Sequence, residues 1–296
     1  MINLKEYFIA PSEPKIKKNE FQPASYFRKE FFIEKEIQKA EVYITACGMY
    51  QGYLNDEAIS NQVFTPGFTY YVKRMQYQTF NVTSLLKKGS NVLGVIVGDG
   101  WYRGSIGISS KRNYYGTHTN LAVFLELKYS DGTQAVIKSD TSWKTTQNGP
   151  IRKSDLKEGE IYDARMELTG WLSSKYNDSQ WNSAIPSTYA GDLVPSEGEA
   201  VLEHERFTPE VIVTPDGSTV LDFKQNLFGY VEFAVSGKSG QKVKLIHGET
   251  LDEKGNFTLK NLILEGFSFK THKIFQEIHY IDRKSTRLNS SHGKLS

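Results

Sequence analysis

The sequence of 296 residues contains a single cysteine, Cys47. One thiol permits no internal disulfide and supplies too few ligands for a thiolate metal cluster. The six histidines are isolated, and no two of them form the His-x-x-x-His pair that indicates a zinc site. Disulfide-stabilised scaffolds and zinc ribbons are therefore excluded.

Long apolar runs are also missing. No stretch approaches the roughly 18 consecutive apolar residues that a membrane-spanning helix requires. The first ten residues place Lys5 and Glu6 where a secretory signal needs a continuous apolar segment. We therefore expect a chain, or a fragment of one, that has no membrane partner and is cytoplasmic.

An excess of charge of one sign is absent as well. The net charge is +2, and residues 282–296 alone carry a net +3, which leaves −1 for the rest of the chain. A nucleic-acid-binding protein is expected to show a basic face or stripe. The near-neutral body therefore disfavours nucleic acid as a partner.

Helical periodicity is almost absent, and the composition favours strands and turns. The chain has 17 Phe, 17 Tyr, 4 Trp and 24 Gly. Apolar runs bounded by Gly, Asn, Asp or Pro recur about every ten residues, which is typical of an all-β sandwich. The predicted strands of the first half are residues 25–33, 40–46, 50–54, 75–81, 91–98, 121–129 and 134–138.

Turn residues separate these predicted strands. Asn55, Asp56 and Glu57 follow one strand as a tight hairpin, because Asn and Asp tolerate positive φ. Residues 130–132 (Ser-Asp-Gly) join the next clear pair of strands. Residues 82–89 combine a Thr or Ser N-cap, an apolar pair and a terminal glycine, and so predict one helical turn.

The pattern divides the chain into four parts. Residues 1–24 are an N-terminal extension, and residues 25–190 form a jelly-roll-like β-sandwich. Residues 191–281 form a second β-rich domain, with predicted strands at 201–213, 219–223, 229–236 and 241–247. No closing strand follows, so we predict that this second sandwich is incomplete. Residues 282–296 are a polar tail of non-native appearance, which we exclude from the fold prediction.

Acidic residues are densest in residues 154–165. Asp155, Glu158, Glu160 and Asp163 stand there together, and paired carboxylates are the groups that glycosidases use. Charge clusters are usually solvated and carry no chemistry. We therefore expect a solvated loop in which Asp163 or Glu160 pairs with Arg165, with no catalytic residue.

The glycine-dense segment 98–104 (GDGWYRG) is a further candidate. It lacks the Lys-Ser/Thr ending and the following helix of a phosphate-binding loop. Trp101 and Tyr102 offer faces for stacking on a sugar, and Asp99 and Arg103 offer hydrogen bonds to its hydroxyls. The alternative is an aromatic plug of the core. No Gly-x-Ser-x-Gly nucleophile motif is present, and Cys47 is expected to be buried in a strand.

Oxygen-rich turns leave calcium as a further prediction. Asn55 and Asp56 supply carboxylate and carbonyl oxygens of the kind that calcium binds. A plain hairpin turn explains the same residues. No cofactor is otherwise expected.

Several motifs occur in an order that resembles bacterial α-L-rhamnosidases. The resemblance covers about residues 25–261. The motifs are residues 26–31 (YFRKEF), 40–55 (AEVYITACGMYQGYLN), 65–68 (TPGF), 77–83 (YQTFNVT), 98–104 (GDGWYRG), 159–165 (GEIYDAR), 220–231 (VLDFKQNLFGYV) and 247–252 (HGETLD). One position departs from the family pattern, because Lys224 stands where the family has glycine. A positive φ there would strain the lysine.

The resemblance implies that the intact protein hydrolyses terminal α-L-rhamnosyl groups with inversion. In the family the acid and base carboxylates lie in a C-terminal (α/α)6 barrel, which this sequence lacks, so no residue here inherits a catalytic role. Some members bind rhamnose through calcium, which adds interest to Asp99 and to the Asn55–Asp56 turn. The expected partners are rhamnose-containing glycosides and the missing barrel. The alternatives are a free-standing carbohydrate-binding module and a purely structural pair of β-domains.

Overall fold

The structure is a computed structural model that describes residues 3–12, 20–107, 111–262, 276–283 and 289–292. The elements within these ranges are nearly all β-strands, and the helices are single turns. They are the 3-10 helices η1 (Leu4–Tyr7), η2 (Thr83–Leu85), η3 (Ala164–Met166) and η4 (Lys260–Leu262), and the α-helical turn α1 (Gly100–Arg103). None of the helices in the described ranges is long and apolar enough to cross a bilayer.

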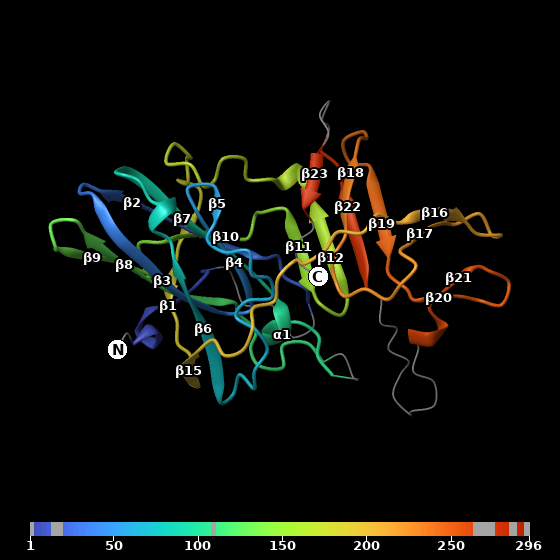
Figure 1. Cartoon of the computed structure of the whole chain (residues 1–296), viewed down its shortest axis with the longest axis horizontal. Helices are drawn as coiled ribbons and strands as arrows, with labels where there is room; N and C mark the ends of the chain where they lie inside the picture. Colours follow the sequence, from blue (N-terminus) through green and yellow to red (C-terminus); the bar gives the residue numbers. More distant parts are fainter. Residues whose placement is uncertain (1–2, 13–19, 108–110, 263–275, 284–288, 293–296) are drawn as a thin grey trace.

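Two stacked sheets build the first unit (Figure 1). One sheet has the order β14 (Ile185–Pro186), β1 (Phe8–Ala10), β8 (Asn120–Tyr129), β3 (Ile37–Cys47), β6 (Arg74–Asn81) and β15 (Asp192–Pro195), with β9 (Gln134–Lys138) paired to β8. The other has the order β13 (Asn182–Ser183), β10 (Lys144–Thr146), β2 (Ser25–Ile33), β7 (Gly89–Gly98), β4 (Met49–Leu54) and β5 (Glu57–Ala58).

Strand β8 shows how the sequence builds this sandwich. Successive side chains of a strand point to opposite faces of the sheet. Leu121, Val123 and Leu125 are fully buried and face the main core between the two sheets. Ala122 and Phe124 face the other side and contribute to a second cluster. The run is therefore apolar throughout because both faces of the strand are covered.

The main core lies between the two sheets. Phe27 from β2 and Val95 from β7 meet Ile44 from β3 and Trp143 within it, and all four are fully buried. Burial of side chains of this size contributes roughly 1.5–3 kcal/mol each. The second cluster lies on the outer face of the first sheet and includes Cys47, which is buried as expected.

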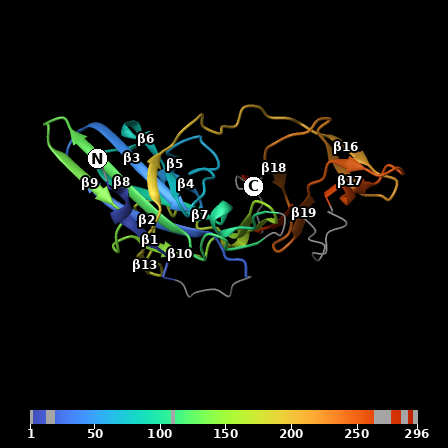
Figure 2. The ribbon, with the colours of Figure 1, turned by 90° about the horizontal axis from the view of Figure 1, so that it is seen from below.

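A third sheet joins the first unit to the second. It has the order β11 (Ile151–Asp155), β12 (Gly159–Asp163), β22 (Glu277–Ile281) and β19 (Lys242–Ile246). Strands β12 and β22 pair in parallel, from Glu160 opposite Ile278 to Asp163 opposite Ile281. In Figure 2, β19 of this sheet lies between the first sandwich and the far end of the second unit. The boundary predicted at residue 190 therefore runs across a continuous sheet.

The rest of the second unit consists of strand pairs. They are β16 (Glu210–Val213) with β17 (Thr219–Asp222), β18 (Glu232–Val235) with β23 (Asn289–His292), and β20 (Thr250–Leu251) with β21 (Phe257–Thr258). Strand β23 belongs to the segment that the sequence analysis set aside as a tail. After β17, Lys224 has a φ of +62°, so the lysine adopts the strained conformation considered for this position.

The all-β fold class is confirmed, and so are all seven strands predicted for the first half. Strands β2 and β9 have the predicted bounds, and the hairpin at Asn55 and Asp56 has positive φ at both residues. Residues 100–103 form the helical turn α1 directly after β7. One local prediction was wrong. Residues 154–165 form the hairpin of β11 and β12, and are not a solvated loop, because the adjoining sheets cover them.

Candidate functional site

The glycine-dense segment 98–104 follows β7 directly and forms the turn α1. Gly100 has a φ of +53°, and a Cβ there would lie 2.8 Å from the backbone nitrogen of Met49. A Cβ on Gly104 would lie 2.3 Å from the carbonyl oxygen of Gly100. Only glycine fits at either position. The tight turn fixes the directions in which the intervening side chains leave the backbone.

A buried ion network lies beneath this turn. Asp99 accepts from the Arg103 guanidinium, and its second oxygen accepts from Arg112 at 3.0 Å. Arg112 also donates to Asp155, which in turn accepts from the Ser105 backbone N–H at 2.8 Å. The side chains of Asp99 and Asp155 are fully buried. Buried charges are stable in a protein interior when they are paired in this way.

The network changes the interpretation of two predicted sugar-binding residues. The structure brings Asp99 and Arg103 together, but Arg103 is only 1% exposed and also donates to Gln22. Both side chains therefore form their hydrogen bonds with other groups inside the protein. Their burial argues against direct contact with a sugar at the surface and assigns them the support of the turn that carries Trp101.

Trp101 and Tyr102 both pack against the second cluster, and Trp101 in addition contacts rings of the surface. The Trp101 ring is half-buried and lies 5.9 Å from Phe64 and 5.9 Å from Phe68, measured between ring centroids. Phe64 in turn lies 5.7 Å from Phe228, which is 88% exposed and comes from the second unit. We call Phe64, Phe68, Trp101 and Phe228 the aromatic surface. Tyr102 packs inward, as the alternative of a core plug predicts.

Tyr102 packs inward against Cys47, whose thiol is buried. The Tyr102 ring lies 5.5 Å from Tyr71, and its hydroxyl is hydrogen-bonded to the Cys47 thiol. Burial raises the pKa of Cys47 to about 12. The thiol is therefore protonated at neutral pH and acts as a core residue.

The loop that carries Phe64 is fixed to strand β4. Phe64 has a φ of +60°, a conformation that bulky residues rarely adopt. The next residue, Thr65, donates from its hydroxyl to the Tyr50 carbonyl at 2.7 Å, and its own carbonyl accepts from the Tyr50 N–H at 2.9 Å. These two bonds hold Phe64 at the aromatic surface. No sequence motif marks Phe64 or Phe228 as a neighbour of Trp101.

The predicted calcium turn lies at the other end of β4. Asn55 and Asp56 follow Leu54, whereas Met49 at the start of the strand pairs with Gly98, so about 16 Å of strand separates the two places. The Asn55 amide donates to the Leu85 carbonyl at 2.9 Å, and its oxygen accepts from the Val92 N–H at 3.0 Å. The turn thus has a structural explanation.

Metal binding at the Asn55–Asp56 turn stays a prediction. Within the described ranges, no three His, Cys, Asp or Glu side chains are grouped so that they could hold a metal ion.

The acidic residues of β11 and β12 have separate partners. Asp163 accepts from the Arg165 guanidinium at 2.8 Å and 2.7 Å, so the expected pair with Arg165 is confirmed for Asp163. This hydrogen bonding lowers the pKa of the Asp163 carboxyl. Glu158 lies 3.8 Å from Lys153. Glu160 is different, because its carboxyl has no hydrogen bond or ion pair with any described residue.

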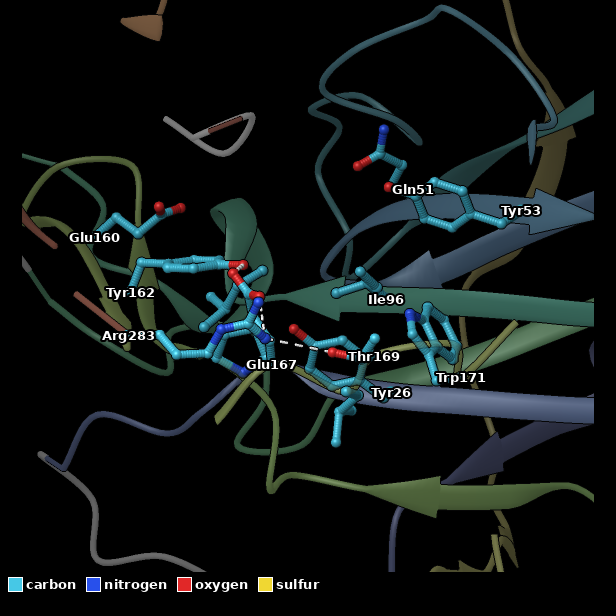
Figure 3. Close-up of a pocket in the computed structure, with 13 residues that line it drawn as sticks. Tyr26, Gln51, Tyr53, Ile96, Glu160, Tyr162, Glu167, Thr169, Trp171 and Arg283 are labelled. Atoms are coloured by element: carbon cyan, nitrogen blue, oxygen red, sulfur yellow. Dashed lines mark hydrogen bonds and ion pairs between the residues drawn. The ribbon is translucent and has the colours of Figure 1, made fainter. Parts of the chain in front are cut away.

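Glu160 lines a cavity of about 420 Å³ between the first sandwich and the joining sheet (Figure 3). In Figure 3, Glu160, Tyr162 and Arg283 lie on one side and Gln51, Tyr53 and Trp171 on the other. The lining residues are Tyr26, Gln51, Tyr53, Ile96, Pro150, Ile151, Glu160, Tyr162, Glu167, Leu168, Thr169, Trp171 and Arg283. Sequence analysis missed this cavity because its walls come from segments more than 100 residues apart.

Two domain families match the chain. The family described as alpha-L-rhamnosidase N-terminal domain matches residues 35–205. The bacterial alpha-L-rhamnosidase concanavalin-like domain matches residues 212–283. The order of the two domains agrees with the first sandwich and the second unit of the structure.

Relatives with this arrangement include curated alpha-L-rhamnosidases. The enzyme of Streptomyces avermitilis is 36% identical over 246 residues, which cover 81% of this chain and 23% of that protein. The enzyme of an Alteromonas species is 37% identical over 240 residues, covering 80% of this chain and 26% of that protein. The chain therefore spans about a quarter of the length of these relatives.

Solved structures give the same result. The alpha-L-rhamnosidase of Aspergillus terreus superposes with a TM-score of 0.89 at 33% identity, over 98% of this chain and 32% of that one. The Streptomyces avermitilis enzyme complexed with L-rhamnose has a TM-score of 0.80 at 31% identity, over 93% of this chain and 26% of that one.

The stacked sheets and the joined second unit thus define an all-β sandwich protein. Within that class, the chain belongs to the family of alpha-L-rhamnosidase N-terminal domains.

Proposed function

We propose that the intact protein hydrolyses terminal α-L-rhamnosyl groups, and that this chain contributes its non-catalytic N-terminal β-domains. The observation that supports the proposal is the ordered pair of family domains in a chain that spans about a quarter of its relatives. The two carboxyl groups of an inverting glycosidase stand about 6.5–9.5 Å apart across the bond that is cleaved. The acidic residues of β11 and β12 are instead paired with cations or enclosed in a cavity.

We further propose that the aromatic surface contacts the rhamnosyl group of a substrate. The apolar face of a pyranose stacks on aromatic rings, and Trp101 is held half-exposed between Phe64 and Phe68. The buried Asp99–Arg103 pair fixes the turn beneath it. An open surface of this kind binds a monosaccharide weakly, with a Kd of about 10 µM to 1 mM. We also propose that calcium binds at the turn formed by Asn55 and Asp56.

An activity assay tests the first proposal. The purified chain is incubated with an aryl α-L-rhamnoside, and release of the aryl alcohol is measured against a buffer blank. We expect no release, because the family resemblance places both carboxyl groups of the reaction in a barrel that is separate from these β-domains. Hydrolysis above the blank would overturn the assignment of a non-catalytic role.

A free-standing carbohydrate-binding module and a purely structural pair of domains are the alternatives. The reading frame that follows codon 281 in the gene separates the first alternative from our proposal, which expects several hundred further residues of helical pattern. Rhamnose titration separates the second, because a purely structural pair gives no binding heat at about 10 mM sugar.

A further inference from the structure

The cavity lined by Glu160 contains a buried acid without a partner in the described part of the chain. Five Asp and Glu residues are buried among the described residues: Asp99, Asp155, Glu160, Asp163 and Asp282. Four of them accept hydrogen bonds from arginine or tyrosine side chains. Glu160 is 3% exposed and makes no such bond in the described part of the chain. A buried carboxyl without a partner is costly, and proteins retain few of them.

Aromatic rings line the cavity that Glu160 also lines. Tyr26 from β2 and Tyr162 from β12 are the titratable groups that interact with it electrostatically. Trp171 contacts Tyr26 edge-on at 5.5 Å between centroids, and Tyr53 contacts Trp171 at 6.2 Å. Aromatic faces attract cations through their quadrupole. The walls of the cavity therefore suit a positively charged group that carries apolar atoms.

The side of the cavity that carries Glu160 also holds a guanidinium, which is paired with another carboxylate (Figure 3). The Arg283 guanidinium lies 3.1 Å from Glu167, and Glu167 also accepts from the Tyr162 hydroxyl at 3.2 Å. One carboxylate of the cavity is thus neutralised by a guanidinium. Burial raises the pKa of Glu160 to about 8, so the carboxyl holds a proton at neutral pH and ionises when a cation binds beside it.

We propose that the cavity binds an organic cation, a guanidinium or alkylammonium group, whose charge pairs with Glu160 and whose apolar part lies against Tyr26, Tyr162 and Trp171. The site is separate from the aromatic surface and does not depend on the proposed glycosidase function. A volume of about 420 Å³ accommodates an arginine-sized guest. The same group can come from a free amine or from a side chain of a partner protein.

Calorimetric titration of the full chain tests the proposal with methylguanidinium and with N-methylurea, its neutral analogue of the same shape. We expect heat with methylguanidinium and none with N-methylurea. Because the carboxyl must ionise to pair with the cation, affinity should rise about tenfold or more between pH 6 and pH 8, with proton release visible as buffer-dependent heat. Agmatine and N-acetyl-argininamide then distinguish a free amine from a peptide side chain.

The variant Glu160→Gln keeps the shape of the side chain and removes its charge. It should lose at least about tenfold in affinity for methylguanidinium. The matched control is Glu57→Gln, an exposed carboxylate on β5 that should leave binding unchanged. Equal binding of N-methylurea, equal affinity of Glu160→Gln, or no heat with any cation at about 10 mM would overturn the proposal. If Glu160→Gln fails to fold, the proposal is still tested by the wild-type protein, through the comparison of methylguanidinium with N-methylurea and of pH 6 with pH 8.

Discussion

Asp99 and Arg103 form an ion pair across one helical turn, and neither side chain reaches solvent, with exposures of 0% and 1%. Arg112 completes the arrangement by bridging Asp99 to Asp155. The pair thus connects the end of β7 to the end of β11, whose residues lie about 50 positions further along the chain. The turn that presents Trp101 depends on this connection.

Removal of one partner should therefore destabilise the protein. We expect Asp99→Ala to lower the free energy of unfolding by about 3–5 kcal/mol, because the buried Arg103 guanidinium loses its counter-charge and Arg112 loses one of its two carboxylates. Urea unfolding followed by fluorescence measures the loss. The control Glu57→Ala removes an exposed carboxylate on β5 and should change stability by less than about 0.5 kcal/mol. A folded Asp99→Ala protein of normal stability that no longer binds rhamnose would instead favour direct contact with the sugar.

Trp101→Ala should reduce rhamnose binding while leaving the fold intact. The ring is half-exposed, and its loss removes a stacking face, which we expect to weaken binding about tenfold. Calorimetric titration of L-rhamnose, with calcium and with chelator, measures the effect. Phe32→Ala serves as the matched control, since Phe32 is 65% exposed on β2 and lies outside the aromatic surface. Unfolding of Trp101→Ala would favour a core role for the ring.

The buried Glu160 should make stability fall as pH rises. Its pKa is about 8 in the folded chain against an ordinary value of 4.5, so between these values the folded state holds a proton that the unfolded state releases. The stabilisation is complete below about pH 4.5 and is lost as pH rises through about 8. At about 1.4 kcal/mol per unit, the change amounts to several kcal/mol.

Unfolding experiments between pH 5 and 9, on wild type and on Glu160→Gln, isolate this contribution. The difference in stability between the two proteins should grow in favour of the variant as pH rises. A difference that stays constant across this range of pH would show that Glu160 titrates normally.

Local patterns predicted most strands of the sandwich but little of the site. Strand β2 has its predicted bounds because alternation and flanking turns are properties of consecutive residues. The burial of Asp155 and Glu160 was not predictable in this way. Arg112, which pairs with Asp155, lies 43 positions away, and the walls of the cavity that Glu160 lines come from two sheets and the segments that connect their strands. A charged residue in a sequence is predicted to be exposed unless the distant residues that pair with it in the fold are known.

The parallel pairing of β12 with β22 leads to the last prediction. Gly159 has a φ of +84°, and a Cβ there would lie 2.0 Å from the carbonyl oxygen of Glu277 at the start of β22. Gly159→Ala should therefore suffer both backbone strain and a clash with backbone that cannot move aside. Gly132→Ala is the matched control, since Gly132 has a φ of +83° with nothing within 4 Å of an added Cβ. The control should cost about 1–2 kcal/mol from strain alone, and Gly159→Ala clearly more. Hydrogen exchange should show faster exchange of β22 and β19 amides in Gly159→Ala only. Equal costs for the two variants, with unchanged exchange in β22, would contradict the pairing that joins the two units.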